Sequence, residues 1–445
     1  MISSPSSAVK PRYRPRASRA NAAAPAASCA CSPKSCGAAT SMARASTAPG
    51  PNASRCHAST CASAGSASAR WRCSARATSP WRSPPPAAIP PRPWPPAARW
   101  CSRRTGGHMA TAERVAAAIL RAAERTGMPA GVFNMIYGGG VGERLVRHPA
   151  IQAVGFTGSL KGGRALCDMA AARAQPIPVF AEMSSINPVV LLPAALKKRG
   201  EAVADELSAS VVLGCGQFCT NPGLVIGIRS AQFSAFLERF AARMDDQPAQ
   251  TMLNAGTLAS YEKGLAALHA HPRVRHLAGQ PQEGRQARPQ LFQADVSLLL
   301  EGDELLQEEV FGPASVVVEV ADHAELKRAL HGLHGQLTAT LIAEAEDLAS
   351  FADLVPLLEQ KAGRLLLNGY PTGVEVCDAM VHGGPYPATS DARGTSVGTL
   401  AIDRFLRPVC YQNYPDAWLP EALKDGNPLG IARLVDGVGT RAAID

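Results

Sequence analysis

The first 112 residues of this 445-residue chain contain no aspartate, glutamate, leucine, phenylalanine or glutamine. They carry 16 of the 45 lysines and arginines and none of the 36 acidic residues, so the formal net charge of +9 arises in this stretch alone. A segment without leucine or phenylalanine cannot bury enough apolar surface to offset its chain entropy. We therefore predict that residues 1–108 are disordered, and their charge indicates nothing about partners of the remainder.

Long apolar runs are also absent. No stretch approaches the length that a membrane-spanning helix needs, and the N-terminal region lacks the apolar core of a secretory signal. Its arginine and serine content is typical of an organelle transit peptide, but without leucine it cannot form the amphipathic helix of such leaders. A disordered basic arm that binds nucleic acid is the alternative interpretation.

Cysteines are scattered along the chain. Seven of the twelve fall within residues 1–108, at spacings that match no familiar zinc site, and the other five are thinly spread. This distribution fits a reducing compartment better than a disulfide framework. We therefore expect a cytoplasmic protein without a bound metal.

From Met109 onward, helical and strand patterns alternate. Apolar residues at spacings of three and four predict a helix over 111–126, and further helices are expected over 161–173 and 201–213. The predicted strands span 131–140, 151–159, 177–185, 221–230, 314–320 and 337–343, and loops are expected from residue 363 onward. Strands separated by helices imply parallel pairing in an α/β sheet that is covered on both faces.

Two residues are candidates for covalent chemistry. Cys219 in "LGCGQFCTNPG" lies among small residues after a predicted helix, so a substrate could reach its sulfur as a nucleophile. Taken alone, an isolated cysteine is more often a buried structural residue. Glu182 in "FAEMSSINPVV" ends an apolar strand, where a carboxylate is costly unless it is paired, solvated at a cleft or catalytic.

Two glycine-containing turns are weaker candidates. In "GFTGS", a strand runs into a glycine turn before a helix, so backbone amides and the hydroxyls of Thr157 and Ser159 could bind a phosphate. "QEEVFGP" combines carboxylates with an aromatic residue at a turn, and alone it is typical of an ordinary loop.

In this order and at these distances, the four segments resemble the aldehyde dehydrogenase superfamily, from about Gly106 to the C-terminus. The variant "EMSSINP", together with "GQFCTNPG", "LLLNGYPTGVEV" and "HGGPYPATSD", is similar to the branch that oxidises α-ketoglutarate semialdehyde (2,5-dioxopentanoate). Long-chain or other aldehydes remain the alternative substrates, and a non-catalytic scaffold with a basic arm is a third interpretation.

The resemblance implies a mechanism. Cys219 as a thiolate would attack the aldehyde carbon, and its backbone amide would help hold the oxyanion. Hydride would then pass to NAD(P)+, and Glu182 would activate the water that hydrolyses the thioester.

The resemblance also implies a cofactor site. Thr157, Gly158 and Ser159 would lie near the pyrophosphate of NAD(P)+, Glu309 would bond the nicotinamide-side ribose, and Phe311 would pack beside it. The choice between NAD+ and NADP+ stays open.

The implied fold is α/β and aldehyde dehydrogenase-like. A parallel-sheet cofactor domain, N-terminally incomplete, would leave its remnant at 109–185, followed by an α/β catalytic domain at 186–395. Residues 396–445 would form a segment that returns to the cofactor domain or mediates oligomerisation. The expected partner is a small-molecule aldehyde, without membrane or nucleic acid, in a homodimer.

The N-terminal stretch has an explanation in the genetic code. If each codon is shifted by one base, "RWCSRRT" (99–105) decodes as Pro-Val-Val-Leu-Lys-Ala-His, a buried strand ending in lysine, and "TSPWRS" is compatible with Asn-Phe-Pro-Leu-Ala-Phe. These are segments that the family has and this chain lacks. We therefore interpret residues 1 to about 105 as a frame-shifted translation, with Thr78 and Arg103 in place of the family's asparagine and lysine. On this hypothesis the stretch cannot form its strands, the sheet keeps an unpaired edge, and the chain binds NAD(P)+ weakly or not at all.

Overall fold

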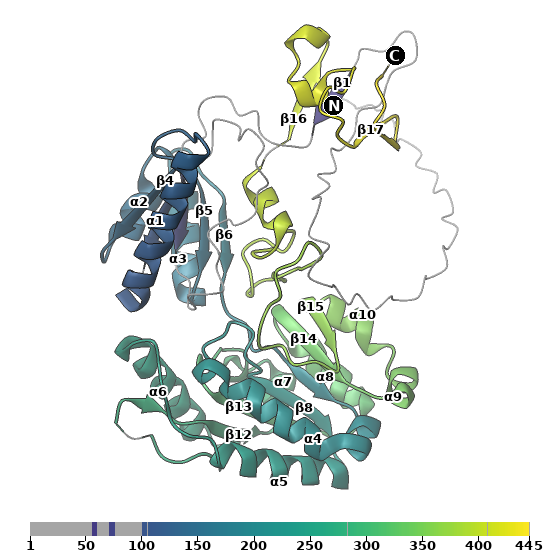
Figure 1. Cartoon of the computed structure of the whole chain (residues 1–445). Coiled ribbons are helices and arrows are strands. Elements are labelled where there is room, and N and C mark those ends of the chain that lie inside the picture. Colours follow the sequence, from purple (N-terminus) through teal and green to yellow (C-terminus); the bar gives the residue numbers. More distant parts are fainter. Residues whose placement is uncertain are drawn as a thin grey trace, which may run out of the picture. The chain divides into compact units, whose positions relative to one another are not determined.

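The computed structural model describes the strands Cys56–Ser59 and Trp71–Ala75 and residues 100–444, apart from positions 105, 283 and 407. Two sheets organise this part of the chain, one of five strands and one of seven. Strands and helices alternate along most of it, in agreement with the predicted α/β class (Figure 1).

The five-stranded sheet is entirely parallel, with strand order β4-β3-β2-β5-β6. Its strands are β2 (Trp71–Ala75), β3 (Trp100–Arg104), β4 (Phe133–Tyr137), β5 (Ile151–Thr157) and β6 (Val179–Glu182). The helices α1 (Met109–Arg125), α2 (Val141–Arg147) and α3 (Leu160–Ala171) pack against it (Figure 1). Because the strands are parallel, their carboxyl ends meet at one edge of the sheet, and Glu182 lies there.

Two strands of this sheet correct the sequence analysis. β2 and β3 lie within residues 1–108, for which we expected disorder and no strands, and they fill the space between β4 and β5. The expectation of an unpaired edge is therefore wrong at this position. Strand pairing uses backbone groups that every residue except proline carries, so the open edges of β4 and β5 can pair with a sequence of unsuitable composition. Thr78 lies outside the described residues.

The seven-stranded sheet has the order β10-β12-β13-β8-β7-β14-β15, and only β10 is antiparallel to its neighbour. Its strands are β7 (Val189–Leu191), β8 (Leu224–Ile228), β10 (Val274–Ala278), β12 (Gln290–Ala294), β13 (Ala314–Val320), β14 (Gln336–Ile342) and β15 (Ala362–Leu367). Its helices are α4 (Pro193–Val212), α5 (Ala231–Asp245), α6 (Ala255–Ala270), α7 (Val296–Glu301), α8 (His323–Gly332), α9 (Ala345–Ser350) and α10 (Leu354–Glu359). Residues 363–367 of the predicted C-terminal loop region thus belong to strand β15.

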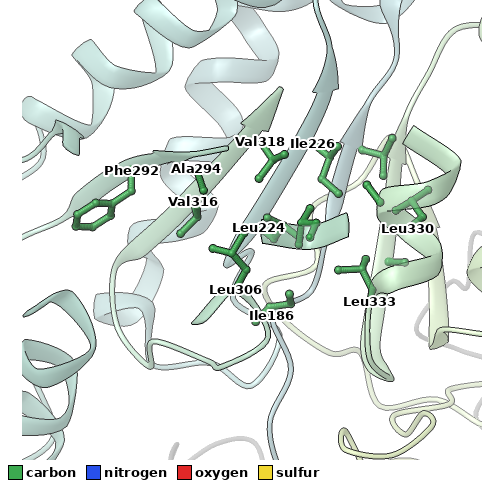
Figure 2. Close-up of a cluster of buried hydrophobic side chains, with 14 of the residues drawn as sticks. Ile186, Leu224, Ile226, Phe292, Ala294, Leu306, Val316, Val318, Leu330 and Leu333 are labelled. Carbon is green, nitrogen blue, oxygen red and sulfur yellow. The ribbon is translucent and has the colours of Figure 1, made fainter. Parts of the chain in front are cut away.

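Alternating side chains of these strands bury both faces of the sheet. Val189 and Leu191 of β7 pack with α4 and α5 in one core, whereas Val190 belongs to the opposite core. Figure 2 shows Leu224 and Ile226 of β8 among the side chains of that second core. Two buried faces make the strand positions rigid, so the loops that follow them are held in place.

Short elements complete the described chain. β1 (Cys56–Ser59) pairs with β16 (Val409–Gln412), β9 (Gln250–Thr251) with β11 (Gln286–Ala287), and β17 (Arg433–Val435) with β18 (Val438–Thr440). None of the helices that the structure describes is long and apolar enough to cross a bilayer.

Candidate active site

The register of the five-stranded sheet sets the position of Glu182, the candidate general base. Glu182 ends β6 opposite Thr157 of β5, and the amide of Gly158 donates a hydrogen bond to the carbonyl oxygen of Glu182 at 3.0 Å. The glycine turn predicted to meet a phosphate therefore begins next to the candidate base.

This turn leads into the N-terminus of helix α3. Ser159 caps the 12-residue helix α3, and its hydroxyl accepts a hydrogen bond from the amide of Gly162 at 3.2 Å. The amides of the first helical turn before Gly162 have no partner within the helix, and together with the helix dipole they favour an anion. Ser159 is exposed, so a phosphate could reach this helix end.

The nucleophile candidate lies on a compressed loop. The short 3-10 helix Leu213–Gly216 precedes Cys219, and Gly216 has a φ of 62°. A Cβ atom on Gly216 would lie 2.2 Å from the backbone of Gly312, in the turn predicted to bind ribose. Asn221 also donates to the carbonyl oxygen of Gly312 at 3.1 Å. The cysteine loop and the "FGP" turn are therefore packed backbone against backbone.

A buried asparagine connects this loop to the segment after Glu182. The Nδ2 of Asn187 donates to the carbonyl oxygens of Cys219 and Asn221, both at 2.9 Å. Its Oδ1 accepts from the hydroxyls of Ser185 at 2.9 Å and Thr338 at 3.0 Å. Asn187 is fully buried, so these bonds fix the distance between the two catalytic segments.

His382 lies between the two catalytic candidates. Its Nε2 is 3.3 Å from Cys219 Sγ and 3.0 Å from Glu182 Oε1. The donor atoms of the three residues all lie within 4.8 Å of one another. The backbone amide of His382 donates to the Thr395 hydroxyl at 2.8 Å, which holds the histidine in place.

The loop that carries His382 is attached along β6. The amide of Met183 donates to the carbonyl oxygen of Ala388, and the amide of Ser390 donates to that of Ala181. The hydroxyl of Ser396 donates to Glu182 Oε2 at 2.5 Å. Residues that are some 200 positions apart in sequence thus lie in one site.

The Glu182 carboxylate is held in its charged form. Burial raises its pKa, but contacts with His382, Ser396 and Cys219 outweigh the burial and lower the pKa to about 2. The pKa of the Cys219 thiol is raised well above its usual range, first by burial and then by the negative charges of Glu182 and Glu309. The resting site therefore holds a carboxylate and a thiol, not a thiolate.

The remaining predicted cofactor residues line a separate cavity. Glu309 and Phe311 border a cavity of about 490 Å³, together with Ser185 and Asn221. Burial of its carboxyl group, reinforced by Glu182, raises the pKa of Glu309 well above its usual range. Glu309 is therefore close enough to the catalytic centre to be affected by its charge.

The structure thus brings Cys219 and Glu182 together, and it places the Thr157–Ser159 turn beside Glu182. The sequence analysis included His382 only within "HGGPYPATSD" and gave it no role. It also missed Asn187 and Ser396. No local pattern distinguishes these residues, because their partners lie far away in the chain.

Comparisons with known proteins identify the family of the chain. Residues 109–385, more than half of the chain, match the family model described as the aldehyde dehydrogenase family. The alpha-ketoglutaric semialdehyde dehydrogenase of Acinetobacter baylyi is 58% identical over 337 residues, which cover 75% of this chain and 64% of the relative. Alpha-ketoglutaric semialdehyde dehydrogenase 2 of Azospirillum brasilense is 54% identical over 334 residues, or 74% of this chain and 63% of the relative. The chain spans less than two thirds of either relative.

Solved structures share the fold at lower identity. A 3,6-anhydro-L-galactose dehydrogenase superposes with a TM-score of 0.62 at 19% identity, over 80% of this chain and 72% of that one. A betaine aldehyde dehydrogenase of Staphylococcus aureus gives 0.62 at 17% identity, over 79% and 69%. With its family model, its relatives and its fold in agreement, the chain belongs to the aldehyde dehydrogenase family.

Proposed function

We propose that the chain oxidises an aldehyde to a carboxylic acid with NAD(P)+, and that its substrate is α-ketoglutarate semialdehyde, which gives 2-oxoglutarate. The observation that carries the proposal is the grouping of Cys219 Sγ, His382 Nε2 and a Glu182 carboxylate oxygen within 4.8 Å. A nucleophile beside a base, with the base oriented by a third group, is the arrangement that covalent catalysis requires. The two relatives named above support the choice of substrate.

The first step forms a bond between Cys219 and the aldehyde carbon. The thiol proton passes to the Glu182–His382 pair as sulfur attacks, which gives a thiohemiacetal. The backbone amide of Cys219 stabilises the oxyanion. Loss of hydride from this oxyanion leaves a thioester on Cys219.

The second step needs a stronger base than the resting carboxylate. Glu182 accepts hydrogen bonds from His382, Ser396 and the Cys219 thiol, which explains its low pKa. Once the sulfur is acylated, it has no proton to donate, so the carboxylate loses one of its three donors. The basicity of Glu182 therefore rises at the step at which it must activate water.

The dinucleotide would be held by the N-terminus of α3 and by the turn over residues 307–313. Gly158 and Ser159 suit its pyrophosphate, and Glu309 with Phe311 suits the nicotinamide-side ribose. When bound there, NAD(P)+ supplies the hydride acceptor.

A cation near the site supports a substrate that bears a carboxylate. Arg404 lines a cavity of about 220 Å³ together with Glu182, His382 and Ser396. Its guanidinium lies against the rings of Phe180 and Phe405, at 5.8 and 5.4 Å. Among the described residues, Arg404 donates from Nε to the carbonyl oxygen of Ala401 at 3.2 Å and makes no ion pair. We infer that it attracts the carboxylate of the semialdehyde.

A cofactor-independent assay separates the chemistry from cofactor binding. An activated ester such as p-nitrophenyl acetate should acylate Cys219 in a burst and then turn over slowly. Cys219→Ser should lose the burst, Glu182→Gln should keep the burst and lose the steady phase, and Cys377→Ser is the matched control at an exposed cysteine. The assay with 2,5-dioxopentanoate and NAD(P)+ then tests the full reaction. A normal burst in Cys219→Ser would refute the proposed nucleophile.

A further inference from the structure

The three residues of the catalytic cluster also form a complete set of ligands for a soft divalent cation. A thiolate, an imidazole and a carboxylate are the donor types that zinc uses, and three protein ligands leave a fourth position open. The sulfur disfavours magnesium and calcium, which prefer oxygen donors. We propose that Cys219, His382 and Glu182 bind Zn2+, and that the ion reversibly blocks the active site.

The distances between the donors suit a tetrahedral ion. With Zn–S near 2.3 Å and Zn–N near 2.0 Å, sulfur and nitrogen lie about 3.5 Å apart, and nitrogen and oxygen about 3.3 Å. The corresponding distances here are 3.3 Å from Cys219 Sγ to His382 Nε2 and 3.0 Å from His382 Nε2 to Glu182 Oε1. These two distances are within a few tenths of an ångström of the tetrahedral values, and the third pair, Cys219 Sγ and the Glu182 oxygen, lies within 4.8 Å.

Hydrogen bonds from other residues hold each of the three ligands in place. Ser396 holds the second oxygen of Glu182, Thr395 holds the backbone of His382, and Asn187 holds the carbonyl of Cys219. Preorganised ligands lose little entropy when the ion binds.

The electrostatic environment favours a cation. The carboxylate of Glu182 lies within 4.8 Å of the sulfur, so the site offers an acidic oxygen next to the thiol. The thiol of Cys219 releases its proton to solvent as the Zn–S bond forms, and no electron is transferred. Two of the three ligands, Glu182 and His382, also line a cavity of about 220 Å³.

One feature limits the affinity. The Nδ1 of His382 is buried and has no hydrogen-bond partner among the described residues. Metal-bound histidines usually donate this group to an acceptor, and the loss of such a partner lowers metal affinity about 10- to 100-fold. We therefore expect weaker binding than at structural zinc sites, as suits a reversible inhibitor.

The test measures protection of Cys219 and needs neither substrate nor cofactor. The full chain is treated with iodoacetamide, with ZnCl2 or with EDTA, and the alkylation of the tryptic peptide 200–229 is located by mass spectrometry. Cys215 in the same peptide is a buried internal reference. Zinc should slow the alkylation of Cys219 about tenfold or more, EDTA should reverse the effect, and MgCl2 should have none.

Variants assign the effect to the site. In His382→Gln the protection should fall below about twofold, whereas His331→Gln, at an exposed position, should keep it. Glu182→Gln provides a second ligand variant if His382→Gln does not fold. Each rate is compared with and without zinc in the same variant, so altered thiol reactivity cancels. Equal protection in a folded ligand variant, or none in the wild type, would overturn the proposal. Absent dehydrogenase activity would bear only on the proposed function.

Discussion

Replacement of Glu182 by glutamine should make Cys219 more reactive, although it should stop steady turnover. The two groups lie within 4.8 Å, and a unit charge at that distance contributes about 3.5 kcal/mol at an effective dielectric constant of about 20. Loss of this charge lowers the pKa of the Cys219 thiol and increases its thiolate fraction. Because a less basic thiolate is also a weaker nucleophile, about half of this free-energy gain appears in the alkylation rate, an increase of about twentyfold.

The assay is the rate of iodoacetamide alkylation of Cys219 near neutral pH, with EDTA present. Glu308→Gln is the matched control, because its carboxylate is exposed and close to the same turn. If alkylation in folded Glu182→Gln is unchanged or slower, the carboxylate does not suppress the thiolate, and our account of the resting site is wrong.

Three further outcomes are expected. Gly216→Ala should lower the free energy of unfolding by about 2 to 4 kcal/mol, because the added Cβ would collide with the Gly312 backbone at a residue with positive φ. Denaturant titration measures this change, and Gly200→Ala, where an added Cβ has no close neighbour, is the control. Equal stability of the two variants would contradict the packing. Arg404→Gln should raise the KM for 2,5-dioxopentanoate about tenfold or more but leave that for a neutral aldehyde unchanged, and equal effects would exclude a carboxylate anchor. The alkylation rate of Cys219 should still rise with pH beyond 9, the ordinary thiol value, because its pKa is raised; a plateau below that pH would contradict the raised value.

The N-terminal stretch contributes backbone pairing to the five-stranded sheet, because β2 and β3 lie between β4 and β5. Binding of NAD(P)+ in the proposed reaction depends in addition on the side chains at the carboxyl edge of this sheet. A gene restored to the shifted frame over residues 1–105 should bind the dinucleotide more tightly than this chain, as measured by calorimetry. Reading the nucleotide sequence checks the premise directly.

Local sequence patterns predicted the bounds of some elements well, but not those of elements whose ends depend on tertiary packing. β13 has the predicted bounds 314–320, since a run of buried β-branched residues is informative by itself. The helix expected at 201–213 instead begins at Pro193, because proline is well tolerated at the first helical position and the helix continues past a kink at Arg199. Such a kink interrupts the periodicity on which sequence reasoning depends.

The sequence by itself indicated the candidate residues, Cys219 in a loop of small residues and Glu182 at the end of an apolar strand, and the resemblance to the family gave them their proposed roles. Only the tertiary structure decided what surrounds them. His382 contacts Cys219, 163 positions earlier in the chain, and Glu182, 200 positions earlier. Asn187 holds the cysteine loop through a hydrogen bond to the carbonyl oxygen of Cys219. The reason is physical: local propensity depends on adjacent side chains, whereas the ionisation of a thiol depends on every charge within a few ångströms, whatever its position in the chain.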